Sequence, residues 1–197
     1  MNYNLLIFIS YFSLITISII GYGLLFLRLL NIKIDAYNFG YVGLLGIYIL
    51  LIYSYLSNLI IAHFELHNLL VLIFGITAFI FSTYKKCSRY KKEYIFTFVV
   101  FILLFISLMQ FKNHDDFSYY HFPYTYYLTQ QSFHFGIGQF NHGFRTPSSI
   151  FYLNSLFYLP FAKFYLFNFT SIFVLGFANI ILLKKVHYYF KFLKIRN

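Results

Sequence analysis

The chain has 197 residues, of which 60% are hydrophobic and only 10% are charged, and its mean hydropathy is +0.70. A soluble domain of this length carries about a quarter charged residues, so the composition excludes an ordinary soluble protein and predicts an integral membrane protein. The single cysteine, Cys87, excludes an internal disulfide and a metal site built on several thiolates. The net charge of +10 is explained by the basic residues that set the orientation of a membrane protein. It therefore does not indicate nucleic acid as a partner.

The apolar runs predict an all-α fold, a polytopic membrane helical bundle with about five transmembrane helices. A spanning helix needs about 20 mostly apolar residues. Five runs meet or approach this length: residues 5–30, 37–62, 66–84, 94–111 and 164–183. The first run is too long for a cleavable signal peptide, and no basic residue precedes it. In the second run, Gly40, Gly43 and Gly46 are spaced to permit close approach of another helix.

These runs divide the chain into three parts. Residues 1–111 form a four-helix transmembrane region, residues 112–163 a long extracytoplasmic loop with an interfacial helix, and residues 164–197 the fifth span with a basic cytoplasmic tail. The interfacial helix is expected at 148–161, which is apolar but short and is bracketed by Pro147 and Pro160. We expect this segment to lie at the membrane surface or to dip in and out, and a sixth span is the alternative.

Positive charge predicts the orientation of the chain. Basic residues mark the cytoplasmic side of membrane proteins. With five spans, twelve of the fifteen basic residues fall on one side, namely those around 28–33, 85–92 and 184–196. This places the N-terminus outside and the C-terminus in the cytoplasm. Six of the seven histidines and three of the five acids then share the outer side, so we expect a functional surface there.

The outer loop contains the strongest local signals. Asp115 or Asp116 is expected to cap a helix that begins at Phe117, with Pro123 limiting or kinking it. Glycines at 136, 138 and 143 indicate turns with close backbone approach. Ser148 or Ser149 is expected to cap the interfacial helix.

Each polar residue of this loop has a functional and a structural interpretation. In the structural interpretation, one of Asp115 and Asp116 caps a helix and the other is a solvated acid. In the functional interpretation, the pair supplies a general base or ligands for a divalent metal ion. In the structural interpretation, Arg145 lies at the membrane surface. In the functional interpretation, it binds a phosphate group, because its guanidinium can donate two parallel hydrogen bonds to phosphate oxygens. His142 and Asn141 bind the same group as Arg145 or tie down a turn.

Other polar groups give weaker signals. His63, Glu65 and His67 form a metal site if they lie on one helical face, although the unremarkable interpretation is favoured. His121 and His134 are interpreted as polar residues at the membrane surface. The chain has no Walker loop, nucleophile elbow or paired cysteines. Apart from Arg28 near the end of the first run, no charge lies inside an expected span, so an ion pathway has no support.

An acidic pair in a long extracytoplasmic loop, followed by an interfacial helix, resembles the GT-C superfamily of membrane glycosyltransferases. The stretches His114-Asp115-Asp116-Phe-Ser-Tyr-Tyr-His121-Phe-Pro123 and Gly136-x-Gly138-x-x-Asn141-His142-Gly143-x-Arg145-x-x-Ser148-Ser149 look like the signature loop of an uncharacterised, GT-C-like bacterial family with many spans. The resemblance covers about residues 113–161. It departs from the superfamily in the four spans that precede the acidic loop and in the total number of spans, which is typically about twice as large.

The resemblance implies a function and a location. The chain would be the N-terminal part of a glycosyltransferase in the bacterial inner (cytoplasmic) membrane, taking sugar from a polyprenyl-phosphate donor on the outer face. Asp116 or Asp115 would act as base or hold a divalent metal, and Arg145 would stabilise the leaving lipid phosphate. The alternative is a non-catalytic membrane module or companion chain in envelope polysaccharide assembly or export. Membrane lipid is an expected partner in both cases.

Overall fold

The structure is a computed structural model, and it describes residues 2–32, 38–84, 87–108, 115–145 and 148–196. Regular structure in these ranges is helical, apart from one isolated bridge between Leu159 and Lys163, which confirms the predicted all-α class. The elements in chain order are α1 (Asn2–Leu29), α2 (Phe39–Asn58), α3 (Glu65–Thr83), α4 (Cys87–Leu108), the π-helical turn η2 (Phe117–His121), α5 (Phe122–Gln130), the 3₁₀ turns η3 (Ile137–Gln139) and η4 (His142–Arg145), α6 (Ser149–Ser155), the 3₁₀ turn η5 (Phe164–Leu166) and α7 (Phe169–Arg196).

Four helical stretches in the described part of the chain are long and apolar enough to cross a membrane. They are Leu5–Leu29, Phe39–Asn58, Glu65–Thr83 and Phe164–Lys191, as expected of an integral membrane protein. The expected span at 94–111 lies partly outside the described residues. Its described part belongs to α4, where every stretch of 18 residues includes Lys91, Lys92 and Glu93, so this helix does not meet the same criterion. The fifth span therefore stays a prediction.

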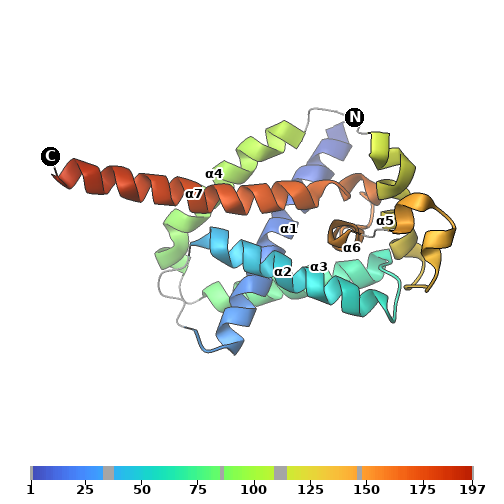
Figure 1. Ribbon diagram of the computed structural model, residues 1–197. Coiled ribbons are helices and arrows are strands. Elements are labelled where there is room, and N and C mark those ends of the chain that lie inside the picture. Colours follow the sequence, from blue (N-terminus) through green and yellow to red (C-terminus); the bar gives the residue numbers. More distant parts are fainter. Residues whose placement is uncertain (1, 33–37, 85–86, 109–114, 146–147, 197) are drawn as a thin grey trace.

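Helix α1 lies at the centre of the bundle and packs closely on α2 and α3 (Figure 1). Glycine makes the close approach of α1 and α2 possible, because a Cβ atom at Gly46 would collide with the backbone carbonyl of Ile19. On the same helix, a Cβ atom at Gly43 would collide with the ring of Phe177 in α7. The structure thus confirms the expected role of these glycines in helix packing.

One end of the bundle, here called the basic end, joins the C-terminal ends of α1 and α3 to the beginnings of α2 and α4. The guanidinium of Arg28 lies 4.3 Å from the ring centroid of Phe81. Glu93 in α4 pairs with Lys184 in α7, and the backbone N–H of Phe39 donates to the same carboxylate at 3.4 Å. The described basic residues of α1, α4 and α7 thus gather at one end, as predicted. Which side of the membrane this end faces stays a prediction.

The opposite end, here called the loop end, is formed by residues 59–64, 115–145 and 148–168. The backbone N–H of His63 donates to the carbonyl of Leu128 at 3.0 Å, which fixes the α2–α3 connection against α5. The hydroxyl of Tyr11 in α1 donates to the carbonyl of Pro160 at 2.9 Å. In Figure 1, α5 and α6 lie beside the junction of α2 and α3 and near the start of α7.

The expected helix at 148–161 is shorter and more deeply packed than predicted. Ser148, one of the two serines expected to cap this helix, does so. Its hydroxyl oxygen accepts a hydrogen bond from the backbone N–H of Ile150 at 3.4 Å. The helix ends at Ser155, and all residues from 151 to 159 are buried within the protein. Leu156 and Phe157 belong to the main core between the long helices, so tertiary packing, not the membrane surface, covers the apolar side chains.

Asn68 is the side chain that anchors this buried segment to the bundle. Its Nδ2 atom lies 2.7 Å from the carbonyl of His63, 2.8 Å from that of Ser155 and 3.0 Å from that of Tyr158. Its Oδ1 accepts from the ring of His67 at 2.9 Å. Buried carbonyls without a donor are costly, so this amide stabilises a chain segment that makes few helical bonds of its own.

We expect Asn68→Ala to destabilise the protein strongly. It removes the donor shared by three buried carbonyls, which we expect to cost about 3 kcal/mol, or roughly 5–10 °C in melting temperature. The measurement is thermal unfolding in detergent, followed by circular dichroism. Leu70→Ala is the control, because Leu70 lies on the same helix and is exposed. Equal melting temperatures for both variants would contradict this role of Asn68.

Candidate functional site

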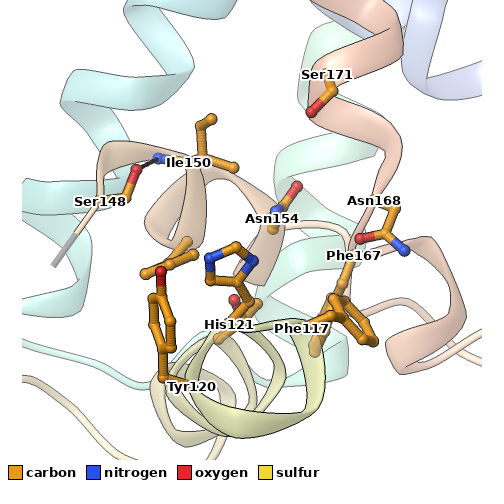
Figure 2. Close-up of a pocket in the computed structure, with 11 residues that line it drawn as sticks. Phe117, Tyr120, His121, Ser148, Ile150, Asn154, Phe167, Asn168 and Ser171 are labelled. Carbon is orange, nitrogen blue, oxygen red and sulfur yellow. Dashed lines mark hydrogen bonds between the residues drawn. The ribbon is translucent and has the colours of Figure 1, made fainter. Parts of the chain in front are cut away.

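A cavity of about 350 Å³ lies at the loop end between η2, α6 and the start of α7 (Figure 2). Its walls come from segments that are up to 54 positions apart in the sequence. Eleven described residues line it: Phe117, Tyr120, His121, Thr125, Ser148, Ile150, Phe151, Asn154, Phe167, Asn168 and Ser171. These described residues combine aromatic rings with amides, hydroxyls and one imidazole, and none of them is Asp, Glu, Lys or Arg.

Pro123 determines the shape of the wall formed by η2. Proline has no backbone N–H, so the carbonyl of Tyr119 cannot receive the usual helical bond from residue 123. The side chain of Asn141 donates to this carbonyl at 3.4 Å. The chain forms a π-helical turn just before α5, in which the N–H of Phe122 bonds the carbonyl of Phe117. The helical hydrogen bonding is thus irregular just before Pro123, and π-helical turns are frequent at functional sites.

His121 occupies the middle of the cavity wall. Figure 2 shows its imidazole between Tyr120 and Asn154. The ring lies edge-on to Tyr120 with 4.4 Å between centroids, and 5.0 Å from the ring of Phe151. These aromatic contacts limit the orientations of the imidazole, so that a ligand in the cavity meets a positioned ring.

Asn154 is oriented by the helix that follows it. The hydroxyl of Thr170 donates to Asn154 Oδ1 at 2.5 Å, and both residues are buried. Because the amide is planar, this bond also fixes where the NH₂ group of Asn154 lies. Together with Asn168 and Ser171, Asn154 gives the cavity a wall of neutral donors and acceptors. Rings beside neutral hydrogen-bonding groups suit a polar ligand with hydroxyls, such as a sugar.

The two aspartates directly precede the first cavity residue in the chain, and neither is among the residues that line the cavity. Asp115 is exposed and Asp116 is half-buried, and both have helical backbone geometry. The Asp116 side chain makes no capping hydrogen bond, so the expected cap at this residue is absent. The next residue, Phe117, is part of the cavity wall. The sequence neighbours Lys112 and His114 lie outside the described residues.

The loop that contains Asn141, His142 and Arg145 is held against η2 but also stays outside the cavity lining. Asn141 Oδ1 accepts from the N–H of Gly143 at 2.8 Å, so Asn141 ties down a turn, one of its two predicted roles. A Cβ atom at Gly143 would collide with Tyr120, which explains a glycine here. Arg145 Nε donates to the carbonyl of Gly138 at 3.3 Å, and both Arg145 and His142 are exposed. Phosphate binding by this loop stays a prediction.

The described residues do not form the metal site that was the less favoured interpretation of His63, Glu65 and His67. No group of three or more His, Cys, Asp or Glu side chains suited to a metal ion occurs in the described part of the chain. The rings of His63 and His67 stack in parallel with 5.1 Å between centroids. All four ring nitrogens have hydrogen-bond partners at 2.6–2.9 Å, so none is directed at a shared metal position.

His63 is fully buried and joins α2 to α6. Its Nε2 lies 2.8 Å from Ser57 Oγ, and its Nδ1 lies 2.6 Å from Ser155 Oγ. Ser155 Oγ donates to the carbonyl of Tyr152, so it accepts from His63 Nδ1, which fits a neutral imidazole. Burial, with the nearby His67, lowers the pKa of His63 from 6.5 to about 3. His63 is therefore a structural residue at neutral pH.

The sequence did not single out most of the cavity lining. His121 was interpreted as a polar residue at the membrane surface, and Asn154, Asn168 and Ser171 were not considered. The sequence did contain a signal for Asn154. The run from Ile150 to Phe157 is apolar except for two adjacent polar residues, Asn154 and Ser155. A polar side chain in such a run needs a partner or a ligand.

Comparisons with known proteins give no relative on which to rest a function. No family model, no curated protein and no solved structure matches this chain.

We expect the stability of the protein to fall as the pH is lowered below about 6.5. The unfolded chain binds a proton at His63 near pH 6.5, whereas the folded protein does so only near pH 3. Between these values the unfolded state binds more protons, and the free energy of unfolding falls by up to about 1.4 kcal/mol per pH unit. Melting temperatures in detergent between pH 7.5 and pH 4.5 measure this dependence.

The test of the assignment is the slope of stability against pH. His63→Gln is expected to be less stable at pH 7.5 and to lose much of the slope, whereas the exposed His142→Gln keeps it. A wild-type slope in His63→Gln would assign the pH dependence to other groups.

Proposed function

We propose that this protein binds the sugar headgroup of a polyprenyl-phosphate donor in the cavity at the loop end, and transfers the sugar as a GT-C-like glycosyltransferase on the extracytoplasmic face. The observation that carries the proposal is that the acidic pair directly precedes, in the chain, a segment that forms a wall of the cavity. Asp116 directly precedes Phe117, the first cavity residue, and Tyr120 and His121 follow within about one turn. A carboxylate on the residue before a cavity wall is a candidate for the general base, which must reach a hydroxyl bound in the cavity.

The chemistry of the lining supports a sugar as the ligand. The faces of Phe117, Phe151 and Phe167 offer apolar surface for a pyranose ring, and Asn154 and Asn168 offer amides for its hydroxyls. The cavity lies near the beginning of a stretch able to cross the membrane, Phe164–Lys191. A headgroup bound there is within reach of a lipid tail that stays in the bilayer.

The proposed reaction is an inverting displacement. The oxygen of an acceptor hydroxyl forms a bond to the anomeric carbon, and the bond from that carbon to the donor phosphate breaks. The Asp116 carboxylate, or that of Asp115, takes the proton of the hydroxyl. The polyprenyl phosphate leaves with the electron pair, and Arg145 stabilises its negative charge. A divalent metal ion on the phosphate is an alternative role for the two aspartates.

A second function is supported by exposed aromatic side chains at the loop end. Phe135, Phe140 and Phe161 are almost fully exposed, at 95%, 88% and 84%. Such side chains suit contact with a companion membrane chain in envelope polysaccharide assembly or export, without catalysis. In that case the cavity and the aspartates serve docking.

The cavity assignment predicts a loss of donor binding when its amides and imidazole are removed. With undecaprenyl-phosphate mannose and undecaprenyl-phosphate glucose as probes, we expect His121→Ala and Asn154→Ala each to weaken binding about three- to tenfold, the effect of one or two neutral hydrogen bonds. Binding is measured on the purified full chain in nanodiscs. His134→Ala is the control, since His134 is exposed outside the cavity. Unchanged binding in both cavity variants, with intact folding, would reject the site.

The catalytic assignment predicts a separate effect on turnover. We expect Asp116→Asn to lower the rate of sugar transfer by about 10²–10⁴-fold, the usual contribution of a general base, while donor binding stays near wild type. Transfer of labelled sugar to endogenous acceptors is measured in membranes that contain the complete protein. Wild-type rates in both Asp116→Asn and Asp115→Asn would reject catalysis by the pair. Donor binding without any transfer in the wild type would favour the non-catalytic function.

A further inference from the structure

A second cavity, with a volume of about 600 Å³, lies between the long helices and is separate from the cavity at the loop end. Its walls come from α1, α3 and α4, with Phe39 at the start of α2. Fourteen described residues line it: Phe12, Ser13, Thr16, Ile17, Ile20, Phe39, Phe79, Thr83, Tyr94, Ile95, Thr97, Phe98, Phe101 and Ile102. No charged side chain is among them, so the lining resembles hydrocarbon.

Helix α4 packs against α7, and the cavity lies between α4 and the helices α1 and α3. Phe101 of α4 packs on Phe177 of α7 with 4.9 Å between ring centroids. At one end of the cavity Phe12 contacts Phe101, with 5.8 Å between centroids. At the other end, which is the basic end, Tyr94 contacts Phe79, also at 5.8 Å. The cavity is therefore elongated along the helices.

The cavity opens sideways towards the surroundings of the bundle. Three of its α4 residues, Ile95, Phe98 and Ile102, are exposed. Because α1 and α3 are long enough to cross a membrane, the medium beside this opening is the acyl region of the bilayer. Hydrocarbon is the material that can enter from that side.

Its size fits a long chain and not a small solute. An engineered apolar cavity of roughly 150 Å³ stays dry and holds one benzene molecule. The present cavity is about four times larger. If the cavity were empty, the side chains that line it would lack van der Waals contacts over a large area, and this would destabilise the protein. A single extended hydrocarbon chain supplies those contacts along the whole length.

One polar group in the lining lacks a partner. Thr97 is 5% exposed, and its Oγ1 has no hydrogen-bond partner among the described residues. The hydroxyls of Thr16 and Thr83, by contrast, donate to carbonyls of their own helices. Rotation about the Cα–Cβ bond of Thr97 turns its hydroxyl between the helix and the cavity, where an ester carbonyl is a suitable acceptor.

The charges at the basic end select the headgroup. Lys91 and Lys92 are exposed and lie one turn before Ile95, at the entrance of the cavity. Among the described residues, the acid near these lysines in the chain is Glu93, which is paired with Lys184. Two lysines beside an apolar channel attract an anionic lipid phosphate, each with about 1 kcal/mol near a charged surface.

We propose that this cavity holds one acyl chain of an anionic phospholipid from the leaflet at the basic end, with the lipid phosphate at Lys91 and Lys92. The site is distinct from the proposed sugar site in position, in lining and in leaflet. The bound lipid joins α4 to α1 and α3 and so stabilises the position of α4.

The first test fills the cavity. Ile102→Trp places a large side chain in the lining, and Ile106→Trp places the same side chain one turn further along α4, at an exposed residue outside the lining. The full chain is purified in detergent with phosphatidylglycerol, and the bound lipid is counted by native mass spectrometry. We expect Ile102→Trp to lower the retained phospholipid at least fivefold and Ile106→Trp to leave it unchanged. Equal retention in Ile102→Trp and wild type would overturn the proposal.

The second test separates the headgroup from the acyl chain. Wild type is expected to retain phosphatidylglycerol at least fivefold more than phosphatidylcholine of the same acyl composition. The double variant Lys91→Gln/Lys92→Gln is expected to bring this ratio close to one. A ratio near one in wild type, or an unchanged ratio in the variant, would overturn the assignment of the anionic headgroup. The failure of either test leaves the sugar-binding experiments unaffected, because these probe the other cavity.

Discussion

The loop end depends on one buried network of hydrogen bonds that satisfies polar backbone inside an apolar protein. His63 and Asn68 come from the α2–α3 connection and the first turns of α3, and Ser155 ends α6. A short helix followed by irregular chain leaves carbonyls unpaired, and these cannot be buried without donors. The network supplies the donors, so 151–159 can lie in the core, and the wall residues of the loop-end cavity are held in place.

This arrangement explains how a membrane-associated bundle presents a polar cavity. The long helices satisfy their own backbones and need only packing. The polar cavity, in contrast, is built where the chain departs from regular helix: the π-helical turn before Pro123, the short α6 and the chain before α7. Two cavities of different character result. One is neutral and polar at the loop end, and the other is apolar and open beside α4.

Several local features could be predicted from the sequence. The cap at Ser148 and the tight packing at Gly43 and Gly46 depend on nearby residues or on the size of one side chain. Helical spacing alone does not show where ring nitrogens point, so the sequence left a metal site at His63 and His67 open as a disfavoured alternative, and only the contacts of the two rings assign them a structural role. His121 was not predicted as a cavity residue. Its neighbours Phe151 and Asn154 are some 30 positions away in the sequence.

The sequence by itself determined that this protein is helical and that most of its helices are apolar enough to cross a membrane. An apolar run of about 20 residues is a local property and can be read along the chain. Only the tertiary structure decided that 151–159 is buried, that His63 is neutral and structural, and that the lining from Phe117 to Ser171 encloses one cavity. These properties arise when distant segments pack together, because burial and hydrogen-bond partners belong to the assembled fold.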